Sequence, residues 1–94
     1  MAKTLDSVHL SGPQGTSIEI KVGEQVAFIN PEVFQDGRAR RIQASVMKST
    51  EARLGPQPYK VLGITLYPSG NTLLSIKGEG ELIDEICKDY FTKA

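Results

Sequence analysis

Hydrophobic and polar residues alternate over much of this chain, which is the pattern of strands with one buried face. Residues 17–22 follow it strictly, and the apolar side chains on one predicted face are Ile18, Ile20 and Val22. Residues 25–30 are apolar on both faces, which favours a strand covered on both sides. A weaker alternating segment, residues 5–10, precedes the turn-rich residues 11–15, where we expect a hairpin loop.

The alternation continues in the second half of the chain. Residues 40–47 are predicted to be a strand whose apolar face consists of Ile42, Ala44 and Val46. A further hairpin is predicted from residues 60–67 and 72–77, because Pro68 stands at a favoured turn position between them. The apolar positions on one face of its first strand are Leu62, Ile64 and Leu66.

After Gly78 the period changes from two to that of a helix. Apolar residues recur as neighbouring pairs every four positions, which places one stripe on a helix made of Leu82, Ile83, Ile86, Cys87, Tyr90 and Phe91. Acidic residues gather at the start of this segment, and Lys88 and Lys93 lie towards its end, as the helix dipole favours. The pattern predicts one amphipathic C-terminal helix over about residues 80–92.

Together these elements predict an α+β fold. About six mainly antiparallel strands would form a twisted meander or a small barrel-like sheet, closed by the C-terminal amphipathic helix. The 94 residues show no internal repeat and no linker, so we expect a single domain over residues 1–94.

Composition narrows the class of protein. Hydrophobic residues make up 39% and charged residues 23% of the chain, which is typical of a folded soluble protein. A single cysteine excludes an internal disulfide, as expected in a reducing compartment. No apolar run approaches the ~20 residues that span a bilayer, and the first residues lack the apolar stretch of a signal peptide. We therefore expect a cytoplasmic protein with no membrane partner.

Candidate catalytic and metal-binding residues are few. His9 and Cys87 are the only residues of their types, so any Cys–His nucleophile pair would consist of them. The predicted helix buries Cys87 in its apolar stripe, and burial disfavours the thiolate that a nucleophile needs. Zinc needs three or four Cys and His ligands, more than this chain contains. We expect no catalytic residue, no metal and no cofactor, and hence no enzyme.

Charge is balanced overall but not along the chain. Eleven basic and eleven acidic residues give a formal charge of zero, which excludes bulk attraction to nucleic acid or anionic lipid. Six basic residues nevertheless fall within residues 31–60, and they form a candidate basic face of Arg38, Arg40, Arg41, Lys48, Arg53 and Lys60. These side chains could contact nucleic-acid phosphates, with Phe34 or Tyr59 stacking on bases. Alternatively, they form a solvated face or a protein contact, or protect a strand edge from aggregation.

Several apolar residues fall in predicted loops or on predicted polar faces. They form a candidate interaction patch of Val33, Phe34, Met47, Leu54 and Tyr59. Self-association is the simplest use of such a patch, because most soluble oligomers are symmetric homo-oligomers. The sequence therefore predicts a small non-catalytic protein–protein interaction or regulatory protein, acting as a homo-oligomer on a protein partner. A nucleic-acid-binding accessory domain is the alternative.

Overall fold

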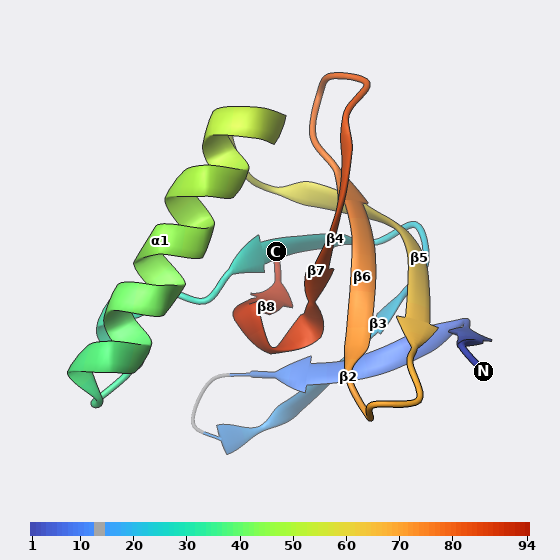
Figure 1. Cartoon of the computed structure of the whole chain (residues 1–94), viewed down its shortest axis with the longest axis horizontal. Helices are drawn as coiled ribbons and strands as arrows, with labels where there is room; N and C mark the ends of the chain where they lie inside the picture. The colour runs from blue at the N-terminus through green and yellow to red at the C-terminus, as the bar shows by residue number, and fades with distance from the viewer. Residues whose placement is uncertain (13–14) are drawn as a thin grey trace.

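The computed structural model describes residues 1–12 and 15–94 and shows an α+β fold rich in strands (Figure 1). The described residues contain one long α-helix, α1 (Gly37–Leu54), in the middle of the chain. The same residues form eight strands, β1 (Lys3–Leu5), β2 (Ser7–Ser11), β3 (Ser17–Lys21), β4 (Gln25–Phe28), β5 (Tyr59–Leu66), β6 (Thr72–Lys77), β7 (Ile83–Cys87) and β8 (Phe91–Lys93).

Six strands form one antiparallel sheet in the order β7-β6-β5-β4-β8, and β1 also pairs with β5. The long strand β5 accommodates both neighbours on one side, because its first residues pair with β4 and its last residues pair with β1. The other two strands, β2 and β3, form an antiparallel hairpin of their own. A hydrogen bond from the Thr92 hydroxyl to the Ser11 carbonyl oxygen, 2.9 Å long, ties this hairpin to β8.

One hydrophobic core joins both sheets and the helix. Its centre is aromatic, because the Phe28 ring packs edge-on against Tyr59 at 6.2 Å and lies tilted against Phe91 at 4.5 Å. The buried apolar residues are Leu10, Ile20, Val26, Phe28, Leu54, Tyr59, Val61, Ile64, Leu74, Ile76 and Phe91. Every strand except β1 and β7 contributes a buried residue to this core. The β2–β3 hairpin and the main sheet therefore share one hydrophobic core.

The helix lies where the sequence predicted a strand. Residues 40–47 belong to α1, so the predicted face of Ile42, Ala44 and Val46 is wrong. Asp36 begins the helix, because its carboxylate accepts a hydrogen bond from the Arg38 backbone N–H. Gly55 ends it with a φ of 87°, a conformation that favours glycine.

A polar contact stripe explains that error. The side of α1 that faces the protein carries Gln43 and Thr50, both buried, as well as Leu54. These positions recur at helical spacing, yet two of the three are polar and so do not register as a hydrophobic stripe. Ile42, which supported the strand prediction, is 45% exposed.

The predicted C-terminal helix over residues 80–92 is also wrong, and so is the six-strand sheet that it would close. This segment contains β7, a 3₁₀ turn η3 (Lys88–Tyr90) and β8. β7 pairs antiparallel with β6, with Lys77 opposite Ile83 and Leu73 opposite Cys87. Apolar pairs such as Ile86 and Cys87 fit a helix stripe, but a strand directs two neighbouring residues to opposite faces.

Two of the hairpins that the sequence predicted are confirmed, with one change of face, whereas residues 17–22 and 25–30, on either side of Gly23 and Glu24, do not pair with each other. β5 and β6 pair from Lys60 opposite Lys77 to Leu66 opposite Thr72. A register shift between Val61 and Gly63 inserts an extra residue, so Val61 and Ile64 are both buried. Leu62 therefore faces outwards, contrary to the predicted alternation.

The β2–β3 hairpin joins the two alternating segments nearest the N-terminus. Ile20 in β3 is fully buried, as its place on the apolar face predicts, whereas Val22 lies beyond the strand and is exposed. Of the expected loop over residues 11–15, Pro13 and Gln14 lie outside the described residues.

Helix α1 packs over the junction of the two end strands of the main sheet, β7 and β8, which η3 joins in sequence (Figure 1). The Gln43 amide nitrogen donates to the carbonyl oxygens of Ile29 and Tyr90, each at 2.9 Å. At the other end of the helix, Arg53 forms an ion pair with Asp84 of β7. None of the helices in the described part of the chain has the length and hydrophobicity to cross a membrane.

Candidate interaction surfaces

One charged surface is the side of α1 that points away from the sheet. We call this the outer face, and it consists of Arg38, Arg41, Ser45, Lys48 and Ala52, all of them exposed. At 3.6 residues per turn these positions fall within a sector of about 80°, and its three cations span about 15 Å along the axis. The outer face therefore presents three positive charges in a row, with the small side chain of Ser45 between Arg41 and Lys48 and that of Ala52 beyond Lys48.

The structure brings together only half of the predicted basic face. Arg38, Arg41 and Lys48 share the outer face, and none has a side-chain hydrogen bond or ion pair among the described residues. Arg40 lies on one flank of the helix, where its guanidinium donates to the Phe34 carbonyl oxygen at 3.3 Å. Arg53 lies on the opposite flank.

Lys60, the sixth member of the predicted basic face, does not lie on the helix. It is an exposed residue of β5, opposite Lys77 in β6 and Gln25 in β4. Sequence distance alone could not show this separation, because the chain leaves the helix at Gly55 before it enters the sheet.

Arg53 has a structural partner that fixes the end of the helix. Its guanidinium donates to the Asp84 carboxylate, which is almost wholly buried while the arginine stays largely in solvent. Close by, the Tyr59 hydroxyl donates to the Gly55 carbonyl oxygen at 2.7 Å. Burial, followed by the nearby carboxylates of Glu51 and Asp84, raises the pKa of Tyr59, so this hydroxyl stays protonated. The cluster attaches the last turn of α1 to β7.

The predicted interaction patch divides between core and surface. Leu54 and Tyr59 are buried in the hydrophobic core and cannot contact a partner, which corrects their assignment to a surface. Leu54 closes the contact stripe of α1, and Tyr59 begins the buried face of β5, so both serve packing. Met47 is half-buried against the same core. Only Val33, which is exposed, and Phe34, which is half-buried, remain near a surface.

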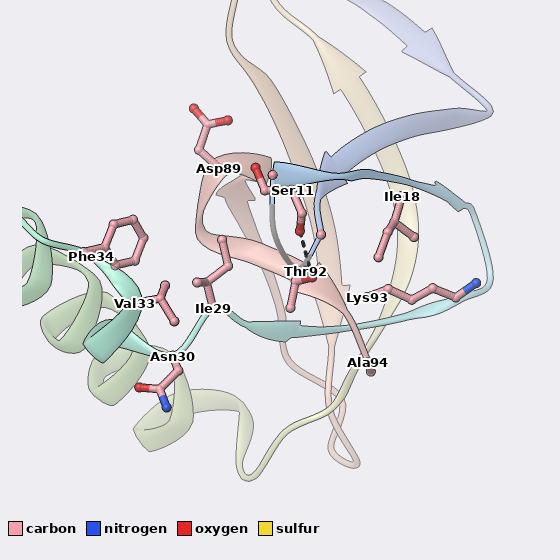
Figure 2. Close-up of a pocket in the computed structure, with 12 residues that line it drawn as sticks. Ser11, Ile18, Ile29, Asn30, Val33, Phe34, Asp89, Thr92, Lys93 and Ala94 are labelled. Atoms are coloured by element: carbon pink, nitrogen blue, oxygen red, sulfur yellow. Dashed lines mark hydrogen bonds between the residues drawn. The ribbon is translucent and has the colours of Figure 1, made fainter.

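Val33 and Phe34 lie at one side of an open hollow of about 840 Å³ (Figure 2). The far side is formed by Ile18 of β3 and by β8, and Ile29 lies between them. Polar groups near it are engaged within the chain, since the Thr92 hydroxyl donates to Ser11 and the Asn30 side chain accepts from the Glu32 backbone N–H. The apolar side chains of Ile18, Ile29, Val33 and Phe34 line the hollow together with the charged Asp89 and Lys93.

A second charged surface lies at the turn between β6 and β7. We call it the acidic tip, and it consists of Glu79, Glu81, Leu82, Ile83 and Glu85, all exposed. Leu82 and Ile83 are 61% and 56% exposed, although the sequence predicted them in a buried helix stripe. Gly78 and Gly80, which favour a turn, were the signal that could have corrected this.

The two residues considered for catalysis lie in different strands. His9 is exposed on β2 opposite Glu19, and Cys87 is a half-buried free thiol at the end of β7. Within the described ranges, no group of three or more His, Cys, Asp or Glu side chains could hold a metal ion.

The charges are divided between the helix and the rest of the molecule. α1 contains five basic residues and one acidic residue, a formal charge of +4, so the remaining 76 residues carry −4.

Compared with models of protein families, with curated proteins and with solved structures, this chain matches none of them. Its function is therefore inferred from the surfaces described above.

Proposed function

We propose that this chain is a non-catalytic protein–protein interaction module that docks on an acidic surface of a partner protein. The outer face of α1 is the docking surface. The observation that carries the proposal is that Arg38, Arg41 and Lys48 share one exposed helix face and that none of them has a side-chain hydrogen bond or ion pair with another described residue. The module acts as a regulatory or accessory protein.

Unpaired cations on one helix face carry a small cost. Like charges one turn apart, as at Arg38 and Arg41, destabilise a helix by about 0.2–0.5 kcal/mol, by analogy with measured pairs. An acidic partner removes this repulsion and replaces it with attraction. Complementary charge also speeds encounter and fixes orientation, which suits a docking surface.

The charge of the remaining molecule favours a protein partner over nucleic acid. A bound DNA duplex extends beyond a cationic stretch of about 15 Å. It carries one negative charge per about 1.7 Å along its whole length. There it meets the part of the chain that carries −4. An acidic patch on a protein can match the outer face without this repulsion.

Nucleic-acid binding is the second candidate, and one observation favours it. The small side chain of Ser45 lies between Arg41 and Lys48, and that of Ala52 lies one turn beyond Lys48, which allows close approach of a phosphate backbone. Three phosphate contacts would make log K fall with log salt at a slope of about −3. Titration of a fluorescent DNA duplex at several salt concentrations measures this slope, and a duplex that does not bind at low salt would remove the candidate.

We further propose that the module acts in the cytoplasm and as a homo-oligomer. A single cysteine that has no disulfide partner within the chain supports a reducing compartment. Opposite charges on α1 and on the remaining molecule support contacts between copies.

Capture from a lysate of the cell that makes the protein tests the proposed docking surface. We expect a protein partner to be retained by the wild type and lost by the triple variant Arg38→Ala, Arg41→Ala, Lys48→Ala. The matched control removes three exposed lysines outside α1, at Lys3, Lys21 and Lys60, and should retain the partner.

Nuclease treatment of the lysate separates the two candidates. A partner that is retained after treatment and lost only in the outer-face variant supports docking on a protein. Retention by the outer-face variant would refute the assignment of the surface. Loss of the partner from the wild type after treatment would show that nucleic acid mediates the binding.

A further inference from the structure

The acidic tip has the properties of a ligand for the outer face of α1. Glu79 and Glu81 supply negative charges opposite in sign to the cations of the outer face, and Glu85, in β7, adds a third carboxylate that accepts hydrogen bonds from the Tyr67 hydroxyl at 2.8 and 2.9 Å. Leu82 and Ile83 stand exposed between these acids, at the end of a hairpin. Ile42, 45% exposed on the flank of α1, offers an apolar contact beside the cations.

The two surfaces adjoin each other within one molecule. Arg53 pairs with Asp84, so the last turn of α1 lies against the start of β7. Gly78, which begins the turn between β6 and β7, packs directly on the carbonyl of Leu54 at the end of the helix. In Figure 1 the turn between β6 and β7 extends past this end of the helix.

Adjoining patches of opposite charge are self-complementary under a two-fold rotation. An axis between them brings the outer face of each copy onto the acidic tip of the other, and both contacts form at once. Ile42 and Arg53 are eleven residues apart, about three turns, so they lie on the same flank of α1, the flank towards β7. This flank would lie at the centre of such a contact.

We propose that the occupant of the outer face is the acidic tip of a second copy of this chain, in a two-fold dimer. This inference deepens the proposed function by naming a partner for the same surface, and it rests on that function's docking face. Pairing of β7 with β7 of another copy is disfavoured for two reasons. Helix α1 covers the junction of β7 and β8, and the adjacent carboxylates of Asp84 and Glu85 would lie near the like charges of the second β7.

Charge reversal in two different variants tests the dimer. Variant one is Arg41→Glu with Lys48→Glu on the outer face, and variant two is Glu79→Lys with Glu81→Lys on the acidic tip. Each variant alone opposes like charges at both contacts, so sedimentation at low salt should give the 10.3 kDa monomer. The wild type should approach twice that mass at high micromolar concentration, and should return to the monomer at high salt.

An equimolar mixture of the two variants is the decisive sample. Both of its contacts are complementary, so the dimer should reappear as a heterodimer. Net charge alone also attracts these variants, and therefore a control mixture combines variant two with Lys3→Glu, Lys60→Glu. That mixture has the same net charges but only one complementary contact, and it should dimerise at least several-fold more weakly.

A wild type that remains a monomer at low salt would overturn the dimer. So would a control mixture that associates as strongly as the paired variants, because attraction would then follow net charge. Failure of the dimer is distinguishable from failure of the docking surface, since capture of another protein by the outer face is measured separately. Circular dichroism of each variant checks that the fold is retained.

Discussion

Gly78 lies directly beneath the end of α1, where a side chain does not fit. A Cβ atom at this position would overlap the backbone carbonyl oxygen of Leu54, and it would also lie 3.6 Å from the Tyr59 ring. Backbone at a helix end cannot move aside as a flexible side chain can. The glycine is therefore needed for close approach of the turn between β6 and β7 to the helix.

Substitution of Gly78 should loosen this contact. We expect Gly78→Ala to lower the free energy of unfolding by about 1–3 kcal/mol, the range for overpacked sites, as measured by urea denaturation. Gly80→Ala is the matched control, because nothing lies within 4 Å of a Cβ there, and it should be close to neutral. Equal stability of the two variants would contradict the close packing.

Glu24 makes stability depend on pH through a defined set of contacts. Its carboxylate accepts a hydrogen bond from the Lys21 backbone N–H at 2.8 Å, and the Lys93 ammonium lies 3.5 Å away. The hydrogen bond from Lys21, and then the charge of Lys93, hold the pKa of Glu24 below its ordinary value of 4.5. A lowered pKa stabilises the fold above the unfolded pKa, and this contribution is lost as the pH falls through the folded pKa.

The variant Glu24→Gln should therefore be less stable than the wild type at neutral pH. The difference should disappear as the pH falls through the lowered pKa of Glu24 in the folded state, because both proteins are then uncharged at this position. Thermal unfolding at neutral and acidic pH measures it. A difference that stays constant across this range would show that the charge of Glu24 plays no part.

Among the elements, α1 depends on a polar contact for its position. Gln43 is buried, and its amide links the helix to the carbonyl oxygens of Ile29 and Tyr90. Tyr90 also accepts a hydrogen bond from the Ile29 backbone N–H, so it keeps one partner without Gln43. The carbonyl oxygen of Ile29 depends more directly on the Gln43 amide for its hydrogen bond.

We expect Gln43→Leu to destabilise the protein although it adds a hydrophobic side chain to the contact stripe. Leaving a buried carbonyl without its donor costs about 1–3 kcal/mol, which urea denaturation can measure. Ser45→Ala on the exposed outer face is the control, and it should change stability by less than about 0.5 kcal/mol. A stabilised Gln43→Leu would show that the helix packs by hydrophobic contact alone.

Local patterns predicted the hairpins but not the helix. β5 and β6 follow from alternation and a turn, which are properties of neighbouring residues. The docking of α1 depends on Gln43 and Thr50, whose burial becomes favourable only when partners from distant segments are present. Likewise, Leu82 and Ile83 have the spacing of a helix stripe, and only pairing with β6 makes that segment a strand.

The candidate site was predicted in part for the same reason. Sequence order identified a basic region, and the helix then placed Arg38, Arg41 and Lys48 on one face. Sequence order could not show that Arg53 forms an ion pair with Asp84 or that Lys60 lies in the sheet. Leu54 and Tyr59 were predicted to be accessible because they lie in or next to a segment rich in turn-forming residues. In the structure both side chains are buried.

For the whole molecule, the separation of charge predicts that function and stability can be changed independently. The variant Arg38→Ala, Arg41→Ala, Lys48→Ala removes like-charge repulsion and no side-chain hydrogen bond or ion pair of the described residues. Its thermal stability should match or slightly exceed that of the wild type, while partner capture is lost. A marked fall in melting temperature would instead assign these residues to the fold.

The central claim, that the outer face of α1 binds the acidic tip of a second copy, is tested most directly by following backbone amide chemical shifts as the protein is diluted at low salt. We predict changes confined to the outer face, at Arg38, Arg41 and Lys48, and to the acidic tip over residues 79–85. The changes should disappear at high salt, because screening weakens exposed charge contacts. Shifts that do not change on dilution, or that change around the hollow near Ile29 and Val33 instead, would contradict the account.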